Sequence, residues 1–209
     1  MIPKKIKAVR ELLGISETQV SNTIYVNSYK YKRSEGDVAY LTTEMLILLS
    51  IIYRVPFEKF LLDEYTIDDI ICDEYLNSLK GLGKDQIEII LKDNLCLYFP
   101  KKRKKANSTT IDLIKKNERT GFHNNLKFIR ENHNYEASQM AVILEIETEE
   151  YIGLETRSVL PNPTQLKDFL IKLNIKVSDL IISAKWQTTQ ELSVILFLIQ
   201  LTFCTFQDR

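Results

Sequence analysis

The apolar positions of this chain recur at helical spacing over most of its length. Between residues 4 and 62 they divide into short amphipathic stretches, which predicts five short helices. Gly14 is expected to end the first helix, while Ser16 and Asn27 are expected to cap the second and third. Pro56 suits the first turn of the fifth helix, because its missing N–H costs nothing there. The predicted helices cover 4–13, 17–25, 28–34, 42–54 and the residues after Pro56.

The same pattern occurs twice, at a constant spacing of 120 residues. Residues 6–62 lie over residues 126–182 without a gap, and the apolar positions keep their character although few residues are identical. Because the same pattern of core positions occurs in both stretches, the sequence predicts two similar helical domains. The identical pairs include Arg10 and Arg130, Gln19 and Gln139, Tyr31 and Tyr151, and Glu35 and Glu155.

The remaining segments also favour helices. Residues 67–79 and 84–98 form two amphipathic patterns broken between Gly81 and Gly83, and a helical pattern resumes near residue 108. Residues 192–206 are mostly apolar but fewer than the ~20 that a membrane span needs, so we expect a buried or dimer-forming helix and no membrane partner. The predicted all-α fold has a first domain (1–64), a helical linker (65–120), a second domain (121–184) and an apolar C-terminal helix (185–209).

Several residues hold the same places in both copies. The first copy has Val9-Arg10, Gly14-Ile15-Ser16, Val20-Ser21, Tyr31, Glu35 and Val55-Pro56-Phe57; the second has Ile129-Arg130, Met140-Ala141, Ile146, Tyr151, Glu155 and Ile175-Lys176-Val177. This order resembles the Cro/repressor (XRE) family of phage-repressor-like helix-turn-helix proteins, over about half of the chain. The resemblance implies that the third helix of a domain enters the major groove of DNA. It also implies a symmetric homodimer, because two recognition helices must match two half-sites.

The chain departs from the family at two places. Tyr25 and Glu145 stand where the family often has glycine before the recognition helix, which is costly if that turn needs a positive φ. Glu17 and Ala137 stand where the family has a phosphate-binding glutamine. These departures bear on one phosphate contact and on one turn, and the resemblance of the whole register still implies the same fold.

The third predicted helix of the first copy carries the candidate DNA-binding residues. By the resemblance, Ser28, Tyr29 and Arg33 occupy base-reading positions, Lys30 and Lys32 lie at the flanks near phosphate, and Tyr31 points into the core. Arginine donates twice to guanine, and tyrosine contacts a thymine methyl group or a phosphate. A solvated basic helix face is the alternative interpretation. We expect double-stranded DNA as the partner.

The same place in the second copy is acidic. Five glutamates and no lysine or arginine fall within residues 145–155. Carboxylates repel phosphate and release no counterions, so we predict that the second domain does not bind DNA. Glu147, Glu149 and Glu150 form either a solvated face or a contact for a basic partner, which includes the basic run of this chain. That run is Lys101, Lys102, Arg103, Lys104 and Lys105, a solvated loop or a set of possible phosphate contacts.

The charge distribution agrees with this division. The net charge is zero, but residues 1–62 carry +3, residues 63–99 carry −6, residues 100–125 carry +6 and residues 126–209 carry −3. A chain that binds DNA along its whole length would be basic throughout. The first domain and the segment that includes the basic run are therefore the parts suited to DNA.

The composition and the residue spacing argue against a secreted protein, a metal-binding protein and an enzyme. Apolar residues make up 44% of the chain and charged residues 27%, which is ordinary for a globular protein. The three cysteines, Cys72, Cys96 and Cys204, are scattered and odd in number, which indicates a reducing compartment. The chain begins with polar residues and no signal peptide is recognised, so we expect a cytoplasmic protein. His123, His133 and the cysteines lack metal-ligand spacing, and no catalytic motif stands out. We expect no enzyme activity, cofactor or metal.

Two functions remain as expectations. The first is a sequence-specific DNA-binding transcriptional regulator acting as a dimeric repressor, with the second domain and tail available for oligomerisation or sensing. The second is a protein-binding inhibitor of the anti-CRISPR or antitoxin type, built on a helix-turn-helix scaffold that also represses its own promoter. The acidic second copy favours this alternative.

Overall fold

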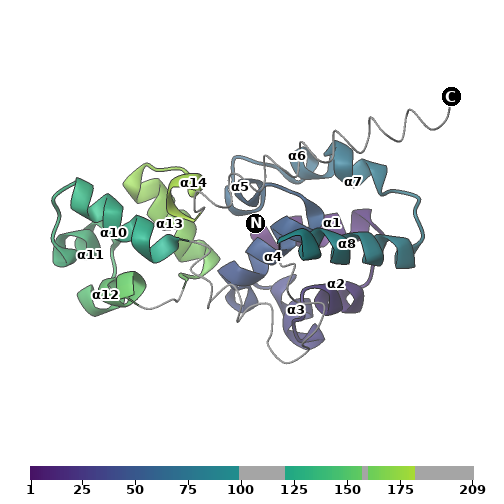
Figure 1. Ribbon diagram of the computed structural model, residues 1–209, viewed down its shortest axis with the longest axis horizontal. Coiled ribbons are helices and arrows are strands. Elements are labelled where there is room, and N and C mark those ends of the chain that lie inside the picture. The colour runs from purple at the N-terminus through teal and green to yellow at the C-terminus, as the bar shows by residue number, and fades with distance from the viewer. Residues whose placement is uncertain (99–120, 157–159, 182–209) are drawn as a thin grey trace.

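The computed structural model describes residues 1–98, 121–156 and 160–181, and every regular element in these ranges is a helix (Figure 1). The all-α prediction is confirmed for this part of the chain. We call the helices of residues 2–61 the first unit. They are α1 (Ile2–Leu12), α2 (Glu17–Thr23), α3 (Ser28–Ser34), the 3₁₀-helix η1 (Val38–Tyr40), α4 (Thr43–Tyr53) and α5 (Phe57–Leu61).

The helix ends differ slightly from the predicted ones. Helix α1 begins before Lys4, because Pro3 lies in its first turn, where proline is tolerated. Helix α2 stops at Thr23, short of the predicted end, since Tyr25 has a left-handed φ of 58° that no helix can include. The predicted range of α3 agrees with the structure. The short helix η1 was not predicted.

Three further helices follow the first unit: α6 (Ile67–Ile71), α7 (Glu74–Ser78) and α8 (Lys84–Tyr98). The single helix predicted over 67–79 is thus wrong, because Asp73 starts a new helix. Its side chain accepts hydrogen bonds from the backbone N–H groups of Tyr75 (3.0 Å) and Leu76 (3.4 Å), which is an N-cap. The predicted helix over 84–98 agrees with α8.

Helix α8 closes one side of the first unit. It packs along α4 and α2, while α6 packs on α1. Its Ile87, Leu91 and Leu95 are buried at a helical spacing of four residues. Asn94 donates a hydrogen bond to the carbonyl of Ile52 in α4 at 2.7 Å. Helix α4 is buried on nearly all of its faces, as an evenly apolar helix must be.

We call the helices of residues 122–180 the second unit. They are α10 (Phe122–Asn132), α11 (Ala137–Leu144), α12 (Thr148–Thr156), α13 (Pro163–Leu173) and α14 (Val177–Leu180). The repeat in the sequence has a counterpart in the backbone of the two units. Residues with a positive φ recur at the spacing of 120: Gly14 (63°) and Asn134 (54°), Tyr25 (58°) and Glu145 (57°), and Arg54 (51°) and Asn174 (50°). The turn before α3 and that before α12 therefore both carry the conformational cost expected of a side chain where glycine is favoured.

A buried ion pair also recurs. In the first unit, Arg10 donates from Nε and Nη2 to the two carboxylate oxygens of Glu35, both at 2.7 Å. In the second unit, Arg130 donates in the same way to Glu155, at 2.8 and 3.2 Å. Each pair joins the first helix of its unit to the end of the third. The same contact therefore orients α3 and α12 on their respective units.

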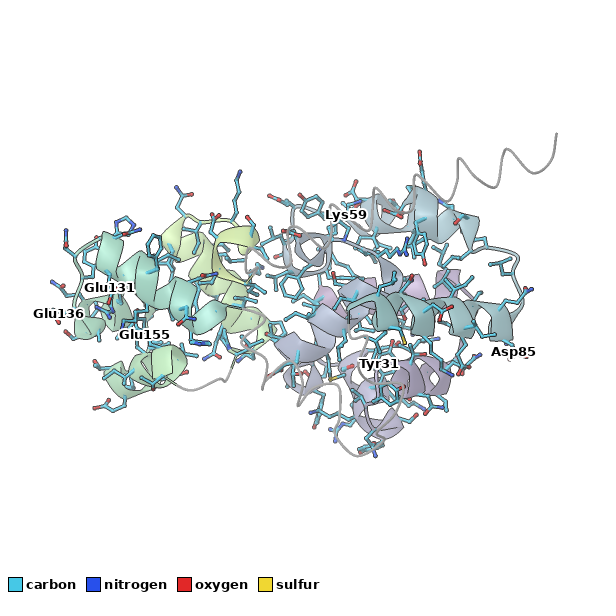
Figure 2. The ribbon with its side chains drawn as sticks, viewed as in Figure 1. Tyr31, Lys59, Asp85, Glu131, Glu136 and Glu155 are labelled. Carbon is cyan, nitrogen blue, oxygen red and sulfur yellow. The ribbon has the colours of Figure 1, made fainter. Side chains whose placement is uncertain are left out.

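The two units differ at the tyrosine that packs beneath this pair. Tyr31 and Tyr151 occupy equivalent positions and are both fully buried, as the sequence predicts for Tyr31. The hydroxyl of Tyr151 donates to Glu155 at 2.5 Å, whereas that of Tyr31 makes no hydrogen bond of regular geometry, although Glu35 and the buried Tyr53 lie close enough to interact with it. Figure 2 labels Tyr31 in the first unit and Glu155 in the second.

Replacing each tyrosine with phenylalanine should separate these two environments. Tyr151→Phe should lower the free energy of unfolding by about 1.5–3 kcal/mol, because a bond to a charged acceptor is lost. Tyr31→Phe should change it by less than about 0.5 kcal/mol or raise it, because no hydrogen bond of regular geometry is broken and a buried hydroxyl is removed. Urea denaturation of the two variants measures both values. Equal losses would contradict this description of the two cores.

Polar contacts join the two units. The hydroxyl of Thr43 at the start of α4 donates to the carbonyl of Pro161 at 2.5 Å. Lys167 in α13 forms an ion pair with Asp63, which follows α5. This hydrogen bond from Lys167 lowers the pKa of the Asp63 carboxyl. Figure 1 shows α13 and α14 on the side of the second unit that faces α4 and α5.

Three predictions fall on residues that the structure does not describe. They are the basic run from Lys101 to Lys105, the helical pattern that resumes near residue 108, and the apolar C-terminal helix. Within the described ranges, no helix combines the length and the apolar character required to cross a membrane.

Candidate nucleic-acid interface

The position of α3 is fixed at its start by Asn27. The side-chain oxygen of Asn27 accepts hydrogen bonds from the backbone N–H groups of Tyr29 (2.9 Å) and Lys30 (3.2 Å). This cap satisfies two of the four N–H groups that a helix leaves unpaired at its N-terminus. Helix α3 also packs against α2, from which a short turn through Tyr25 separates it. The first residues of α3 are therefore held in a defined conformation.

One face of α3 is buried and the other is in solvent. Tyr31 and Ser34 are buried, and the Ser34 hydroxyl donates to the Tyr31 carbonyl at 2.7 Å. The predicted DNA-binding residues lie on the outer side: Tyr29, Lys30, Lys32 and Arg33 are exposed and Ser28 is half-buried. The structure thus brings all five predicted residues onto one short helix that is anchored from beneath.

Tyr40 in η1 belongs to the same surface, although the sequence analysis did not include it. The Arg33 guanidinium lies 3.6 Å from the centre of the Tyr40 ring and 5.6 Å from that of Tyr29. Its Nη1 also donates to the Tyr29 hydroxyl at 3.3 Å. A guanidinium that packs against a ring face keeps its N–H donors at the edge of its plane. The two tyrosines therefore limit the orientations of Arg33 and leave donors for a further ligand.

The charges around this face are favourable to an anion. The exposed residues of α3 include three cations and no carboxylate. The closest acid in the sequence, Glu35, is buried and paired with Arg10, and this hydrogen bond raises the pKa of Arg10. Asp37 uses its side chain to cap η1 through the N–H of Ala39 at 2.9 Å. The exposed face of α3 is thus basic without a neutralising partner on the same helix.

The equivalent surface of the second unit has the same backbone and the opposite charge. Glu147, Glu149 and Glu150 are exposed at the start of α12, while Tyr151 and Leu154 anchor the helix from beneath. Gln165 of α13 donates to the Glu150 carboxylate at 2.9 Å. At the spacing of 120, the places of Lys30, Lys32 and Arg33 are taken by Glu150, Ile152 and Gly153.

Other chemistry has little support in the described residues. His133 is exposed, and its ring stacks on Tyr135 with 5.7 Å between the centroids, which is an ordinary surface contact. No group of three or more histidine, cysteine or acidic side chains is suitably placed for a metal ion within the described ranges. Cys72 and Cys96 are free thiols. The basic surface of α3 is therefore the candidate site.

The cap of α3 offers a test that separates folding from charge. Asn27→Ala should lower the free energy of unfolding by about 1 kcal/mol, because the two capped N–H groups lose their acceptor. Asn27→Asp should keep the stability, because aspartate caps as well as asparagine. It should nevertheless weaken binding of any polyanion to α3, because it adds a carboxylate beside Tyr29 and Lys30. Thermal denaturation together with a DNA titration measures both effects.

Comparison of the chain with protein-family models, with curated proteins and with solved structures finds no match.

Proposed function

We propose that this protein is a sequence-specific DNA-binding transcriptional regulator of the Cro/repressor helix-turn-helix type. The observation that carries the proposal is the outer face of α3. It presents Lys30, Lys32 and Arg33 on a capped helix that packs against a preceding short helix. In such an arrangement the second helix of the pair lies in the major groove and its first residues contact base edges.

Each side chain has a role in this proposal. Arg33 donates two hydrogen bonds to a guanine, with its plane set by Tyr40. Tyr29 contacts a thymine methyl group or a phosphate, and Ser28 lies at the helix start where a base edge is close. Lys30 and Lys32 neutralise phosphates, which supplies affinity that is independent of sequence.

Among the described residues, a single chain presents one basic helix in the recognition position, because α12 is acidic. A symmetric operator of two half-sites then needs two copies of the chain, with half-sites one helical turn, about 34 Å, apart. The proposal therefore includes a homodimer that acts as a repressor in the cytoplasm. The second unit, which makes no base contact in this account, is available for the contact between copies or for sensing.

Selection of sequences from a random pool of double-stranded DNA tests this function. The full chain should enrich a recurring motif, and the motif should be a pair of inverted half-sites about 10 base pairs apart from centre to centre. Enrichment of a single half-site would contradict the proposed homodimer but not the proposed DNA binding. Failure to enrich any motif at moderate salt would contradict the proposed function.

A second function is favoured by the three exposed glutamates of α12. A protein-binding inhibitor of the anti-CRISPR or antitoxin type would use this acidic face against a basic protein or a nucleoprotein. Co-purification of such a partner with the full chain, lost when Glu147, Glu149 and Glu150 are changed to glutamine, would support it. A partner that stays bound to this variant would contradict a role for α12.

A further inference from the structure

Two positions that are buried in the first unit carry isoleucines that are more exposed in the second. Ile51 in α4 is 5% exposed, whereas Ile171, the same residue at the equivalent place in α13, is 63% exposed. Thr23 in α2 is fully buried, whereas Ile143 in α11 is only half-buried. We call the surface formed by Ile143 and Ile171 the open face. It leaves Ile171 largely in water at a place where its counterpart Ile51 is covered.

The first unit has a covering helix, α8, for which the described part of the second unit has no counterpart. Helices α2 and α4, which correspond to α11 and α13, are covered by α8. Asn94 of α8 reaches the last turn of α4, where it donates to the Ile52 carbonyl and accepts from Arg54 at 3.0 Å. The covering helix α8 lies in the part of the chain that follows the first unit. Among the described residues, no helix packs on α11 and α13 in this way.

We propose that the apolar segment 192–206 packs on the open face of its own chain, as α8 packs on the first unit. The segment lies outside the described residues, but its composition and its place in the sequence support the assignment. It comes after the second unit in the chain, as α8 comes after the first unit beyond α6 and α7, and it carries no charged residue over its whole length. A segment of this composition is expected to be covered by apolar surface, and the open face offers Ile143 and Ile171 for that contact.

The length of the connection allows this contact. Residues 181–191 link the end of α14 to the segment. Eleven residues span up to roughly 36 Å when extended, whereas a helix of eleven residues such as α13 is about 16 Å long. The segment can therefore reach the open face from the same chain, without a second copy. This inference does not depend on DNA binding.

Cross-linking of the full chain tests the assignment. In a Cys72→Ser, Cys96→Ser background, Ile171→Cys leaves one thiol on the open face and the native Cys204 in the segment. Bis-maleimides of increasing length should join the two thiols within one chain, at a yield that does not depend on protein concentration. Covalent dimers in place of this product would assign the segment to a second copy and overturn the proposal. Singly modified chains at every linker length would overturn it as well.

Val142 provides a matched control. It is 76% exposed, but its equivalent in the first unit, Asn22, is exposed too, so α8 leaves this position uncovered there. Val142→Cys in the same background should therefore remain unlinked to Cys204.

Thermal stability gives an independent measurement. Ile171→Asn should lower Tm by about 4–8 °C if the segment buries this side chain. Val142→Asn should leave Tm nearly unchanged, since the side chain stays in solvent. A Tm for Ile171→Asn that equals that of the unmodified chain would overturn the proposal.

Discussion

Replacing Arg33 with alanine should weaken binding to the selected DNA by about 1–3 kcal/mol, or roughly 5- to 150-fold, and relax the preference at one base position. The reason is the geometry of the side chain. Its guanidinium is held at 3.6 Å from the Tyr40 ring centre, so little conformational freedom is lost when it binds guanine. Equilibrium titrations against the selected site and against all single-base variants measure the effect.

Two further variants separate charge from shape at this position. Arg33→Lys keeps the charge but loses the planar fork, so it should keep much of the non-specific affinity and lose the base preference. Tyr40→Leu should reduce the same preference in part, because Arg33 loses the ring that orients it. Unchanged affinity and specificity in Arg33→Ala would show that this side chain reads no base.

Replacing Glu35 with glutamine should lower the free energy of unfolding by about 3–5 kcal/mol, the largest loss that we expect from a single change. The Glu35 side chain is only 4% exposed and that of Arg10 only 11%, so the change leaves an arginine without a charged partner in a buried place. Urea denaturation measures the loss. DNA binding should weaken too, because this pair joins α1 to the end of α3.

The double variant is the control for this loss. Arg10→Met with Glu35→Leu removes both charges together and should recover most of the stability, since a buried pair replaced by apolar groups is often neutral. The equivalent change Glu155→Gln should cost less, because the side chains of Arg130 and Glu155 are more exposed, at 17% and 10%. A loss for Glu35→Gln no larger than for an ordinary surface change would contradict a structural role for the pair.

Local sequence rules predicted the parts of the site that depend on neighbouring residues. Asn27 is a strong N-cap, which placed the start of α3, and the resemblance implied that Tyr31 points inward, so the start of the helix and its buried side agree with the sequence-based expectation. The apolar spacing continued α2 through Tyr25, and only the resemblance, whose pattern often has glycine there, drew attention to the turn. Its positive φ is an observed cost that the rest of the fold outweighs.

The parts that depend on distant contacts were not predictable in this way. Tyr40 meets Arg33 because η1 turns the chain back over α3, and no periodic pattern encodes such a turn. Asp73 divides a helix that the apolar spacing alone continues. The contrast between Ile51 and Ile171 appears only when the covering helix α8 is located. The positions of Tyr40 and Ile171 depend on tertiary packing, which overrides local preference, whereas the cap at Asp73 is a local signal that the apolar spacing outweighed.

Fluorescence anisotropy of the full chain with its own upstream DNA, over a series of salt concentrations, is the direct test of DNA binding through α3. We expect tight binding that weakens steeply with salt. Changing Lys30, Lys32 and Arg33 together to alanine should abolish specific binding and lower the salt slope by about two, for the two lost phosphate contacts. Changing Glu147, Glu149 and Glu150 to glutamine should leave specific binding intact. Weak binding that is insensitive to the α3 changes would contradict the account and direct attention to a protein partner of α12.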